Sequence, residues 1–480
     1  MHKRKGSGSF KENEFSKTFS KDTTKESDNS IGEFEDPWED EIESEQEYIE
    51  DNEGIFSNKI YLIANIDLFH DKTNVYLPSS RSLKEDEILE PDQSAYEMLH
   101  SISVQWPCLS FDILEDNLGI ERTRVSFKYL VIYKSIYSLK YPVTMYLVSG
   151  SQADTKKNNV INVIKLSHLC KTQYNENSSI DSNDSIIDED PILEYRSLPT
   201  FGTTNCIRAF SRNENYFTAS FSETGKVHIW NITPHISSIN NPGTCIAKEN
   251  NFPIYTISNH KTEGYAINWN TLSSYNFLIS GDNNGYIYLT SLSETSWFTE
   301  KTPFLGHTSS VEDLAWSPSE KNVFASASSD GTIKIWDIRN KEHKPALSVN
   351  IYTNVDINVI SWNKNVSYLM ASGADDGKFN IWDLRTFQSS STPSSIASFS
   401  WHSAPITSIE WHPLEKSVIS VSDNSHVSLW DLSVEIDDED QFTKEAEGLD
   451  HIPSQLMFIH MGGKDIKETH WHPQIPGCLI

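Results

Sequence analysis

Short runs of alternating apolar and polar residues recur through the second half of the chain. In the clearest run, residues 325–328 and 333–337 show this alternation and are separated by Asp330-Gly331. A period of two predicts half-buried strands, and Asp-Gly is a strong signal for the tight turn between them. Each run contains three such strands, and we expect a fourth in the linker to the next run.

The runs return at regular intervals, and the best ones end on a tryptophan. Trp336, Trp382 and Trp430 are 46 and 48 residues apart. Weaker copies end near residues 230 and 290. A four-stranded sheet of this length buries too little apolar surface alone, so the copies are expected to pack side by side around an axis. The pattern therefore predicts an all-β propeller.

The repeats resemble the WD-repeat family, with Gly306-His307, Asp330 and Trp336-Asp337 as the best copy. The repeats predict seven blades. The first copy lies near residues 146–166, five more end at later positions up to 431, and the seventh begins at residue 466. The spacing leaves the seventh blade short of strands, so either the chain is truncated or its last blade is incomplete. A strand at residues 110–114 is expected to help close the ring.

In WD-repeat proteins a buried His, Asp, hydroxyl and Trp are linked by hydrogen bonds, and two sets of residues match those positions. They are His307, Asp330 and Trp336, and His402, Asp423 and Trp430. Buried polar groups need partners, and in such a set each member supplies another's. We therefore expect a structural hydrogen-bond network, and no catalytic residues, at both places.

His470 and His472 alternate along the sequence and could present two metal ligands on one face of a strand. However, Trp471-His472-Pro473 repeats the tripeptide that begins at Trp411 in the preceding copy. Recurrence at one blade position favours a structural role, so we expect no metal and no cofactor.

A short amphipathic helix is expected before the propeller. Pro91 lies near its first turn, and Tyr96, Leu99 and Ile102 have helical spacing. The helix could simply cover the rim of the propeller, or it could form one wall of a binding groove.

The formal net charge of −29 is concentrated in three stretches. Residues 26–53 contain 14 acidic residues and no basic one, residues 175–194 contain seven, and residues 434–450 contain eight against one lysine. These stretches together carry −28, so the rest of the chain is almost neutral. Acidic segments attract cationic partners and repel nucleic acid. We expect no direct binding of nucleic acid.

The sequence lacks the motifs of the common enzyme classes. It has no phosphate-binding glycine loop, no nucleophile elbow and no metal-spaced Cys/His cluster, so no enzymatic activity is expected. Its five cysteines are far apart, as is typical of reduced thiols inside the cell. The most apolar window, residues 129–148, is interrupted by Lys134 and Lys140, and no membrane association is expected.

Two blocks before the repeats narrow the resemblance. They read Leu89-Glu90-x-Asp92-x-Ser94-Ala95-Tyr96-x-Met98-Leu99-His100 and Gln105-Trp106-Pro107-Cys108-Leu109-Ser110-Phe111-Asp112. With these blocks, roughly residues 75–480 resemble the glutamate-rich WD-repeat proteins, which are related to the retinoblastoma-binding, histone-chaperone WD proteins. The resemblance implies a nuclear and nucleolar factor in ribosome biogenesis. Residues 127–140 have no counterpart, and they are either an extra hairpin or translated non-coding sequence.

The same resemblance implies where a partner binds, because the related histone-binding proteins clamp a basic helical peptide between a loop and the N-terminal helix. The implied apolar contacts are Tyr96, Leu99, Met457 and Phe458. The implied acidic contacts are Glu435, Asp437, Asp438, Glu439 and Asp440. The alternative for these acids is a solvated loop without a partner.

The expected partner is a basic protein. Resemblance implies a large-subunit ribosomal protein of the L-three type, together with ribosome-assembly factors, while a histone is the alternative and a purely structural scaffold is a third possibility. The expected organisation is a disordered arm over residues 1–74 (acidic at 26–53), a segment over 75–115 that holds the helix and the ring-closing strand, and a monomeric propeller over 116–480 with acidic insertions at 175–194 and 434–450.

Overall fold

The computed structural model of the chain divides into two compact units, Met1–Phe56 and Ser57–Ile480. Every residue that the structure describes lies in the second unit: 89, 91, 95–117, 119, 123–125, 137–139, 141–172, 190–212, 214–273, 277–293, 296–352, 355–388, 393–435 and 452–480. The acidic stretch at 26–53 and most of both acidic insertions lie outside the described residues, and so do Asp437, Asp438, Glu439 and Asp440.

The described part of the chain contains six four-stranded antiparallel sheets, numbered here from 1 to 6. Sheet 1 consists of β1 (Phe111–Leu114), β4 (Val143–Gly150), β5 (Val160–Leu169) and β6 (Ile192–Pro199). Sheet 2 consists of β7 (Thr204–Arg212), β8 (Asn215–Ser222), β9 (Lys226–Asn231) and β10 (Tyr255–Ile257). Sheet 3 consists of β11 (Ala266–Trp269), β12 (Phe277–Gly281), β13 (Ile287–Leu292) and β14 (Trp297–Thr299).

The other three sheets follow in chain order. Sheet 4 consists of β15 (Val311–Trp316), β16 (Val323–Ser328), β17 (Thr332–Asp337) and β18 (Leu347–Asn350). Sheet 5 consists of β19 (Ile357–Trp362), β20 (Leu369–Ala374), β21 (Phe379–Asp383) and β22 (Ala397–Phe399). Sheet 6 consists of β23 (Ser408–Trp411), β24 (Val418–Ser422), β25 (His426–Asp431) and β26 (Leu456–Met461).

Few elements lie outside these sheets. A two-stranded ribbon pairs β2 (Thr123–Val125) with β3 (Tyr137–Leu139). The helices are α1 (Thr233–Asn240), which lies between β9 and β10, and the short 3-10 helices η2 (Lys248–Asn251) and η3 (Leu384–Gln388). Within the described residues, no helix is long and apolar enough to cross a membrane.

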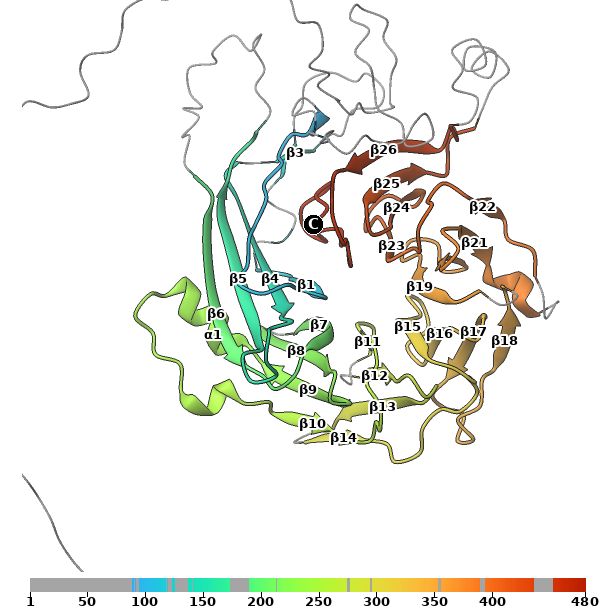
Figure 1. Cartoon of the computed structure of the whole chain (residues 1–480), viewed down its shortest axis with the longest axis horizontal. Helices are drawn as coiled ribbons and strands as arrows, with labels where there is room; N and C mark the ends of the chain where they lie inside the picture. The colour runs from blue at the N-terminus through green and yellow to red at the C-terminus, as the bar shows by residue number, and fades with distance from the viewer. Residues whose placement is uncertain are drawn as a thin grey trace, which may run out of the picture. The chain divides into compact units, whose positions relative to one another are not determined.

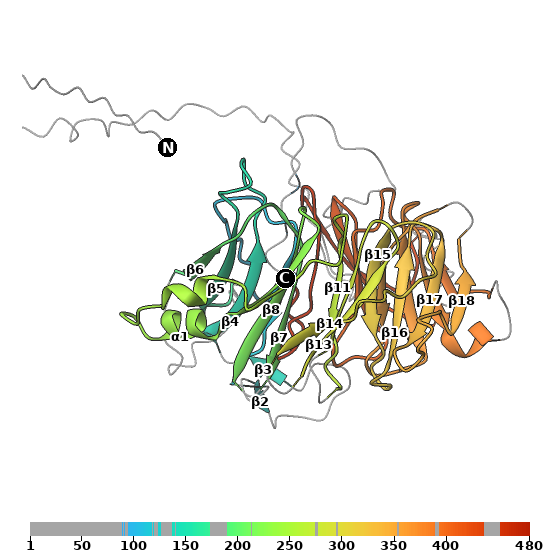
Figure 2. The same cartoon turned by 90° about the horizontal axis from the view of Figure 1, so that it is seen from below.

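The first strands of the six sheets surround a common axis, and the later strands lie progressively outward (Figure 1). Neighbouring first strands contact one another in the order β1, β7, β11, β15, β19, β23. Seen from the side, the sheets stand next to one another (Figure 2). The apolar core therefore lies between adjacent sheets, where the repeated tryptophans Trp230, Trp336 and Trp430 are among the largest fully buried side chains.

A tryptophan at the end of an inner strand joins many of the sheets to the preceding one. The indole Nε1 of Trp269 donates to the carbonyl of Arg208 at 2.9 Å, and that of Trp316 donates to the carbonyl of Asn268 at 3.1 Å. Two further indoles make the same bond: Trp411 to Ser361 at 3.1 Å and Trp471 to Glu410 at 3.2 Å. The first three bonds join adjacent sheets and the bond of Trp471 joins the end of the chain to sheet 6, so these side chains fix neighbouring elements as well as filling space.

The expectation of seven blades is wrong, because the described residues form six. After β26 the chain does return to the axis, and Trp471 takes the inner position beside β23. However, it pairs with Leu479 alone, in a single bridge flanked by mutual backbone bonds between His470 and Ile480. No seventh four-stranded sheet forms in the described part of the chain, so the repeat that begins at Trp471 does not correspond to a seventh blade.

Two irregular segments lie between sheet 6 and sheet 1: the closing segment, defined here as residues 466–480, and the residues around Met98. Ile475 of the closing segment packs against the apolar face of sheet 1, and Met98 packs against the same cluster. Gln474 exchanges two hydrogen bonds with the backbone of Asp116, at 2.9 and 2.7 Å. The strand expected at 110–114 is β1, and it is the inner strand of sheet 1.

The expected N-terminal helix does not extend over residues 96–104, which have no helical structure. Ala95 lies in a 3-10 turn, and residues 92–94 lie outside the described part. The physical reason is that backbone groups of residues 97 and 99 bond to Thr172, just beyond β5, instead of to one another. The carbonyl of Glu97 accepts from the backbone N–H of Thr172 at 3.0 Å, and Leu99 donates to Thr172 in return at 2.9 Å.

Candidate functional site

The N-terminal segment, defined here as residues 95–110, links sheet 6 to sheet 1. The Tyr96 hydroxyl is hydrogen-bonded to Nδ1 of His460 on β26 at 2.7 Å. The Tyr96 ring meets the Phe458 ring edge to face, with centroids 5.4 Å apart. Leu99 lies at the other end of this link, where its backbone bonds to Thr172 beyond β5. Two residues predicted to contact a partner therefore also hold the ring together.

The predicted apolar contacts do not all share one surface. Phe458 is only 9% exposed, because Tyr96 covers it, and Leu99 is half-buried. Met457 precedes Phe458 on β26, so its side chain points to the opposite face of the strand. The structure thus brings Tyr96 and Phe458 together, while Met457 lies apart from them.

Glu435 is the one predicted acidic contact among the described residues, and it is exposed. It follows β25 at the start of the second acidic insertion. The two ends of this insertion lie close together, since the backbone N–H of Asp431 donates to the carbonyl of Gln455 at 2.8 Å. The side-chain amide of Gln455 donates to the carbonyl of Val434 at 3.1 Å.

The first predicted polar set forms a buried chain of hydrogen bonds. His307 joins Nδ1 to Asp330 at 2.9 Å and Nε2 to the hydroxyl of Ser326 at 2.6 Å. The indole of Trp336 donates to the same hydroxyl at 2.7 Å. Burial holds the pKa of His307 below its usual range. Although burial alone would raise the pKa of Asp330, its bond to His307 holds that pKa below the usual range, so the pair is a neutral imidazole beside a carboxylate.

The second predicted set has the same members but takes its hydroxyl from another strand. His402 bonds to Asp423 at 3.1 Å and to Ser428 on β25 at 2.7 Å, and Trp430 donates to Ser428 at 2.8 Å. In sheet 4 the equivalent hydroxyl, that of Ser326, comes from the second strand.

A third set was not foreseen from the sequence. His260 bonds to Asp282 at 3.0 Å and to Ser280 at 2.7 Å. The signal that would have revealed it is the His-Asp spacing, which is 22 residues here and 23 residues for His307 and Asp330. Thr290 stands where the other copies have their tryptophan, and this made the copy hard to recognise.

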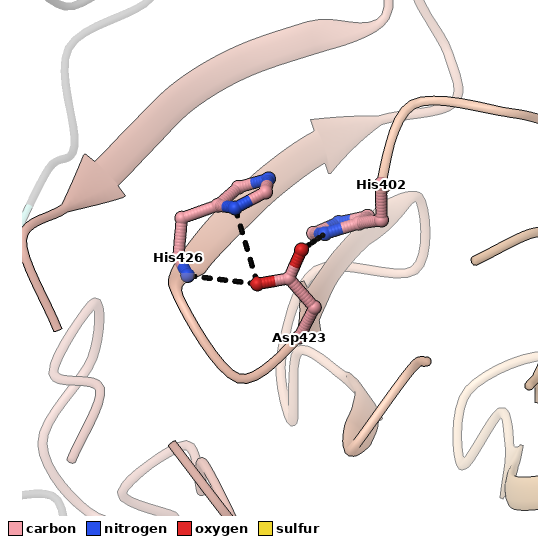
Figure 3. A group of neighbouring side chains, drawn as sticks. All are labelled: His402, Asp423 and His426. Carbon is pink, nitrogen blue, oxygen red and sulfur yellow. Dashed lines mark hydrogen bonds and ion pairs between the residues drawn. The ribbon is translucent and has the colours of Figure 1, made fainter. Parts of the chain in front are cut away.

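His402, Asp423 and His426 are the group in the described residues with metal-like geometry, since their ligand atoms lie within 4.8 Å of one another (Figure 3). Both imidazoles already bond to Asp423 through Nδ1, each at 3.1 Å. The two rings also stack, with centroids 4.4 Å apart and planes inclined by 14°. Stacked rings leave no space for an ion between them, so the arrangement fits a hydrogen-bonded core better than a metal centre.

A half-buried ion-pair cluster near the axis closes the ring. Arg208 on β7 pairs with Glu468 of the closing segment at 3.1 Å. His470 lies between Glu410 on β23 and Glu468, at 3.2 and 3.5 Å. Burial opposes the charged imidazole, but its bonds to the two carboxylates raise the pKa of His470 to about 10. The sequence analysis missed this cluster, because its members lie far apart in the chain and match no motif.

Glu468 connects the cluster to the first strand of the ring. Its two carboxylate oxygens accept from the Ser110 hydroxyl and from the backbone N–H of Phe111, both at 3.0 Å. Burial raises the pKa of a carboxyl group, but the charge of Arg208 outweighs this and lowers the pKa of Glu468 to about 2. All five cysteines lie among the described residues, and none of them forms a disulfide bond.

The six repeated sheets and their His-Asp-hydroxyl-Trp sets define a WD-repeat propeller. A family model described as "WD domain, G-beta repeat" matches residues 298–337, 348–383 and 393–431. Each range combines the outer strand of one sheet with the first three strands of the next, so the three matches begin at β14, β18 and β22. A second model, which describes the histone-binding protein RBBP4 or a component of the CAF1 complex, matches residues 86–170. That range contains the N-terminal segment, β1, β4 and β5.

Full-length relatives identify the family within this class. The chain is 53% identical over 460 residues to "Ribosome assembly protein rrb1" of Schizosaccharomyces pombe, covering 94% of this chain and 91% of that protein. It is 42% identical over 413 residues to "Glutamate-rich WD repeat-containing protein 1" of Dictyostelium discoideum, covering 83% and 80%. It is 39% identical over 439 residues to "Protein HEAT STRESS TOLERANT DWD 1" of Arabidopsis thaliana, covering 85% and 89%. The chain belongs to the glutamate-rich WD-repeat family.

Proposed function

We propose that this protein is a non-enzymatic binding factor in ribosome assembly that acts in the nucleus and nucleolus. The observation that carries the proposal is the identity of 53% over nearly the whole chain to a protein named for ribosome assembly. The described polar sets fit this role, because their members bond to one another and their imidazoles are buried.

The partner that we propose is a basic protein, and specifically a large-subunit ribosomal protein of the L-three type. Its support is electrostatic: three acidic stretches carry almost all of the net charge of −29. A newly made ribosomal protein exposes many Lys and Arg side chains that later contact rRNA. Acidic segments on the binding factor can neutralise these side chains and exclude competing nucleic acid.

A histone is the second candidate partner. The observation that favours it is the match of residues 86–170 to the family model for a histone-binding protein. The two candidates make different predictions for the proteins that copurify with the chain. Ribosomal proteins with assembly factors support the first candidate, and histones with other chromatin proteins support the second.

The test neutralises the proposed acidic contacts and measures binding at two salt concentrations. Glu435→Gln combined with D437N, D438N, E439Q and D440N is expected to weaken capture of the purified basic partner by about tenfold at low salt and to reduce the salt dependence of binding. The readout is the dissociation constant together with the copurified proteins identified by mass spectrometry.

The control removes the same number of exposed acids from other parts of the chain. Its substitutions are E249Q, E320Q, E342Q, D375N and D376N. We expect this control to bind its partner almost as the unaltered chain does. If the two variants, each with five substitutions, bound the partner with equal affinity at low salt, the acids at 435–440 would be a solvated loop without a partner.

A further inference from the structure

A hollow of about 400 Å³ opens at the axis of the ring. It lies where the inner strands β1, β7, β11 and β23 end, and it includes residues just beyond them. Its polar lining consists mainly of Asp112, Glu115, Lys364, Glu410 and His470. Phe210 and Trp471, together with prolines and aliphatic residues, supply apolar walls. The hollow is therefore lined by both charged and flat apolar groups.

Carboxylates outnumber cations at this hollow and in the half-buried cluster beneath it. Glu468 pairs with both Arg208 and His470. The charge of His470 acts on Asp112 and on Glu410, and the charge of Lys364 also acts on Glu410. The carboxylates are Asp112, Glu115, Glu410 and Glu468, and the cations are Arg208, Lys364 and His470, so one positive charge is missing when all four carboxylates are ionised.

Two of the carboxylates that line the hollow differ in their remaining bonding capacity. Glu410 uses Oε2 for His470 and for the backbone N–H of Trp471, while its Oε1 has no hydrogen-bond partner among the described residues. Asp112 accepts only backbone N–H groups, from Ile113 at 2.8 Å and from Ala209 at 2.7 Å. Burial raises the pKa of Asp112, so a cation that entered the hollow would favour its ionised form.

The chain enters and leaves both acidic insertions at the end of the ring where this hollow lies. In sheet 1, β5 ends beside the start of β4, and β1 ends near the same point. In sheet 6, β25 and β23 end together in the same way. The described residues Thr172, Asp190, Glu435 and Ile452 flank the insertions at these ends. A basic protein attracted by the insertions would meet this end of the ring.

We propose that the axial hollow receives an arginine side chain of a basic protein partner. A guanidinium carries five N–H donors and can serve Glu410 Oε1 and Asp112 together, while its flat faces lie against apolar walls such as Phe210. The arginine would supply the missing positive charge. This proposal deepens the proposed function and rests on it only for the basic nature of the partner.

The test uses the full chain and a capped glycine-rich peptide that contains one arginine. Titration calorimetry compares it with the same peptide carrying citrulline, which has nearly the same shape but no charge. We expect the arginine peptide to bind at least about tenfold more tightly. Equal binding of the two peptides would overturn the proposal.

Two variants separate binding at the hollow from ring stability. Asp112→Asn keeps an oxygen that can accept from Ala209 but removes the charge, so arginine binding should fall about fivefold to tenfold. Asp313→Asn is the matched control, because Asp313 accepts from the backbone of Ile360 in the same way, at 2.9 Å, but does not line the hollow. An equal loss of binding in both variants would overturn the proposal.

A third variant reverses the sign of the effect. Lys364→Glu replaces an exposed cation at the hollow, so it should tighten binding of the arginine peptide.

If D112N loses the peptide but captures the whole basic partner normally, the hollow binds arginine and the partner is held elsewhere. If the arginine peptide binds as expected but no basic protein is captured, the hollow is supported and the proposed partner is wrong.

Discussion

The buried imidazoles of His307 and His402 are held neutral by their surroundings. Each of His260, His307 and His402 lies between a carboxylate and a serine hydroxyl. In His307 and His402, burial keeps the pKa below its usual range. Asp330 and Asp423 are therefore the charged members of these two pairs, and several hydrogen-bond donors together stabilise each ionised carboxylate.

At this scale we predict that Asp330→Asn destabilises the protein by about 2–4 kcal/mol. Asp330 accepts from His307, from the backbone N–H of Thr308 and from that of Thr332. An amide places a donor where one of these acceptors was, so at least one buried bond is lost. The measurement is the free energy of unfolding in urea.

The control for this prediction lies in the same sheet. Asp337 pairs with Arg339 at the surface, so Asp337→Asn should change the unfolding free energy much less. Equal destabilisation by the two substitutions would contradict a special role for the buried network.

Sequence patterns predicted the His, Asp and Trp residues of two polar sets, but they did not predict which strand supplies the hydroxyl group of each set. The spacing of His307, Asp330 and Trp336 is repeated closely enough to be recognised. In sheet 6 the hydroxyl comes from Ser428 instead of the second strand, and such a change cannot be read from spacing. The Arg208–Glu468 pair joins residues 260 positions apart, which no local pattern encodes.

Closure of the ring depends on an element that is neither helix nor sheet. The closing segment brings Glu468 and His470 between β1, β7 and β23. The folded-state pKa of His470 is raised from 6.5 to about 10. Its contribution to stability is therefore complete below pH 6.5 and is lost as the pH rises toward 10.

We predict that His470→Gln removes this pH dependence. In the unaltered chain the free energy of unfolding should fall by roughly 3 kcal/mol between pH 6.5 and 10, and in the variant it should fall much less over that window. Glu468 acts in the opposite direction: its pKa is lowered from 4.5 to about 2, so its contribution is lost as the pH falls from 4.5. Urea unfolding at a series of pH values measures both effects.

His412 provides the matched control. His412 is another imidazole of the propeller, but unlike His470 it has its pKa lowered by burial. Its Nδ1 accepts from the backbone N–H groups of residues 414 and 415. His412→Gln should therefore shift stability equally across pH 6.5–10. A wild-type pH slope in H470Q would contradict the role assigned to His470.

The sequence predicted the repeated sheets well and the joint between the ends poorly. Strand alternation and tryptophan spacing are local signals, and they located all three sheets with strong repeats. The apolar spacing of Tyr96 and Leu99 suggested a helix, but tertiary bonds to His460 and Thr172 hold that segment in a non-helical conformation. In the same way, Trp471 repeats the inner-strand signal, yet Ile475 packs on sheet 1.

The net charge of the whole molecule is concentrated in three stretches of its sequence. These acidic stretches carry nearly all of the net charge, and the stretch at 26–53 lies outside the described residues. A dense run of like charges attracts an oppositely charged partner over a long range, which raises the rate of encounter more than the lifetime of a complex.

We predict that replacing the 14 acids of residues 26–53 by Gln and Asn slows association with a basic protein about tenfold at low salt. The dissociation rate should change little. Surface plasmon resonance measures both rates, and repeating the measurement at high salt is the control, because screening should remove the difference. Unchanged association at low salt would show that the arm does not attract the partner.

Joining the ring through residues 96–113 and 456–480 also has a consequence during synthesis on the ribosome. Sheet 1 emerges before the other five sheets, but Ile475, which belongs to the same apolar cluster as Met145 and Leu147, is made only after the strands of all six sheets. Until then, the nascent chain carries an uncovered apolar surface and an unpaired Arg208. Between the synthesis of sheet 1 and the synthesis of Ile475, this protein is itself most exposed to aggregation and most dependent on cellular chaperones.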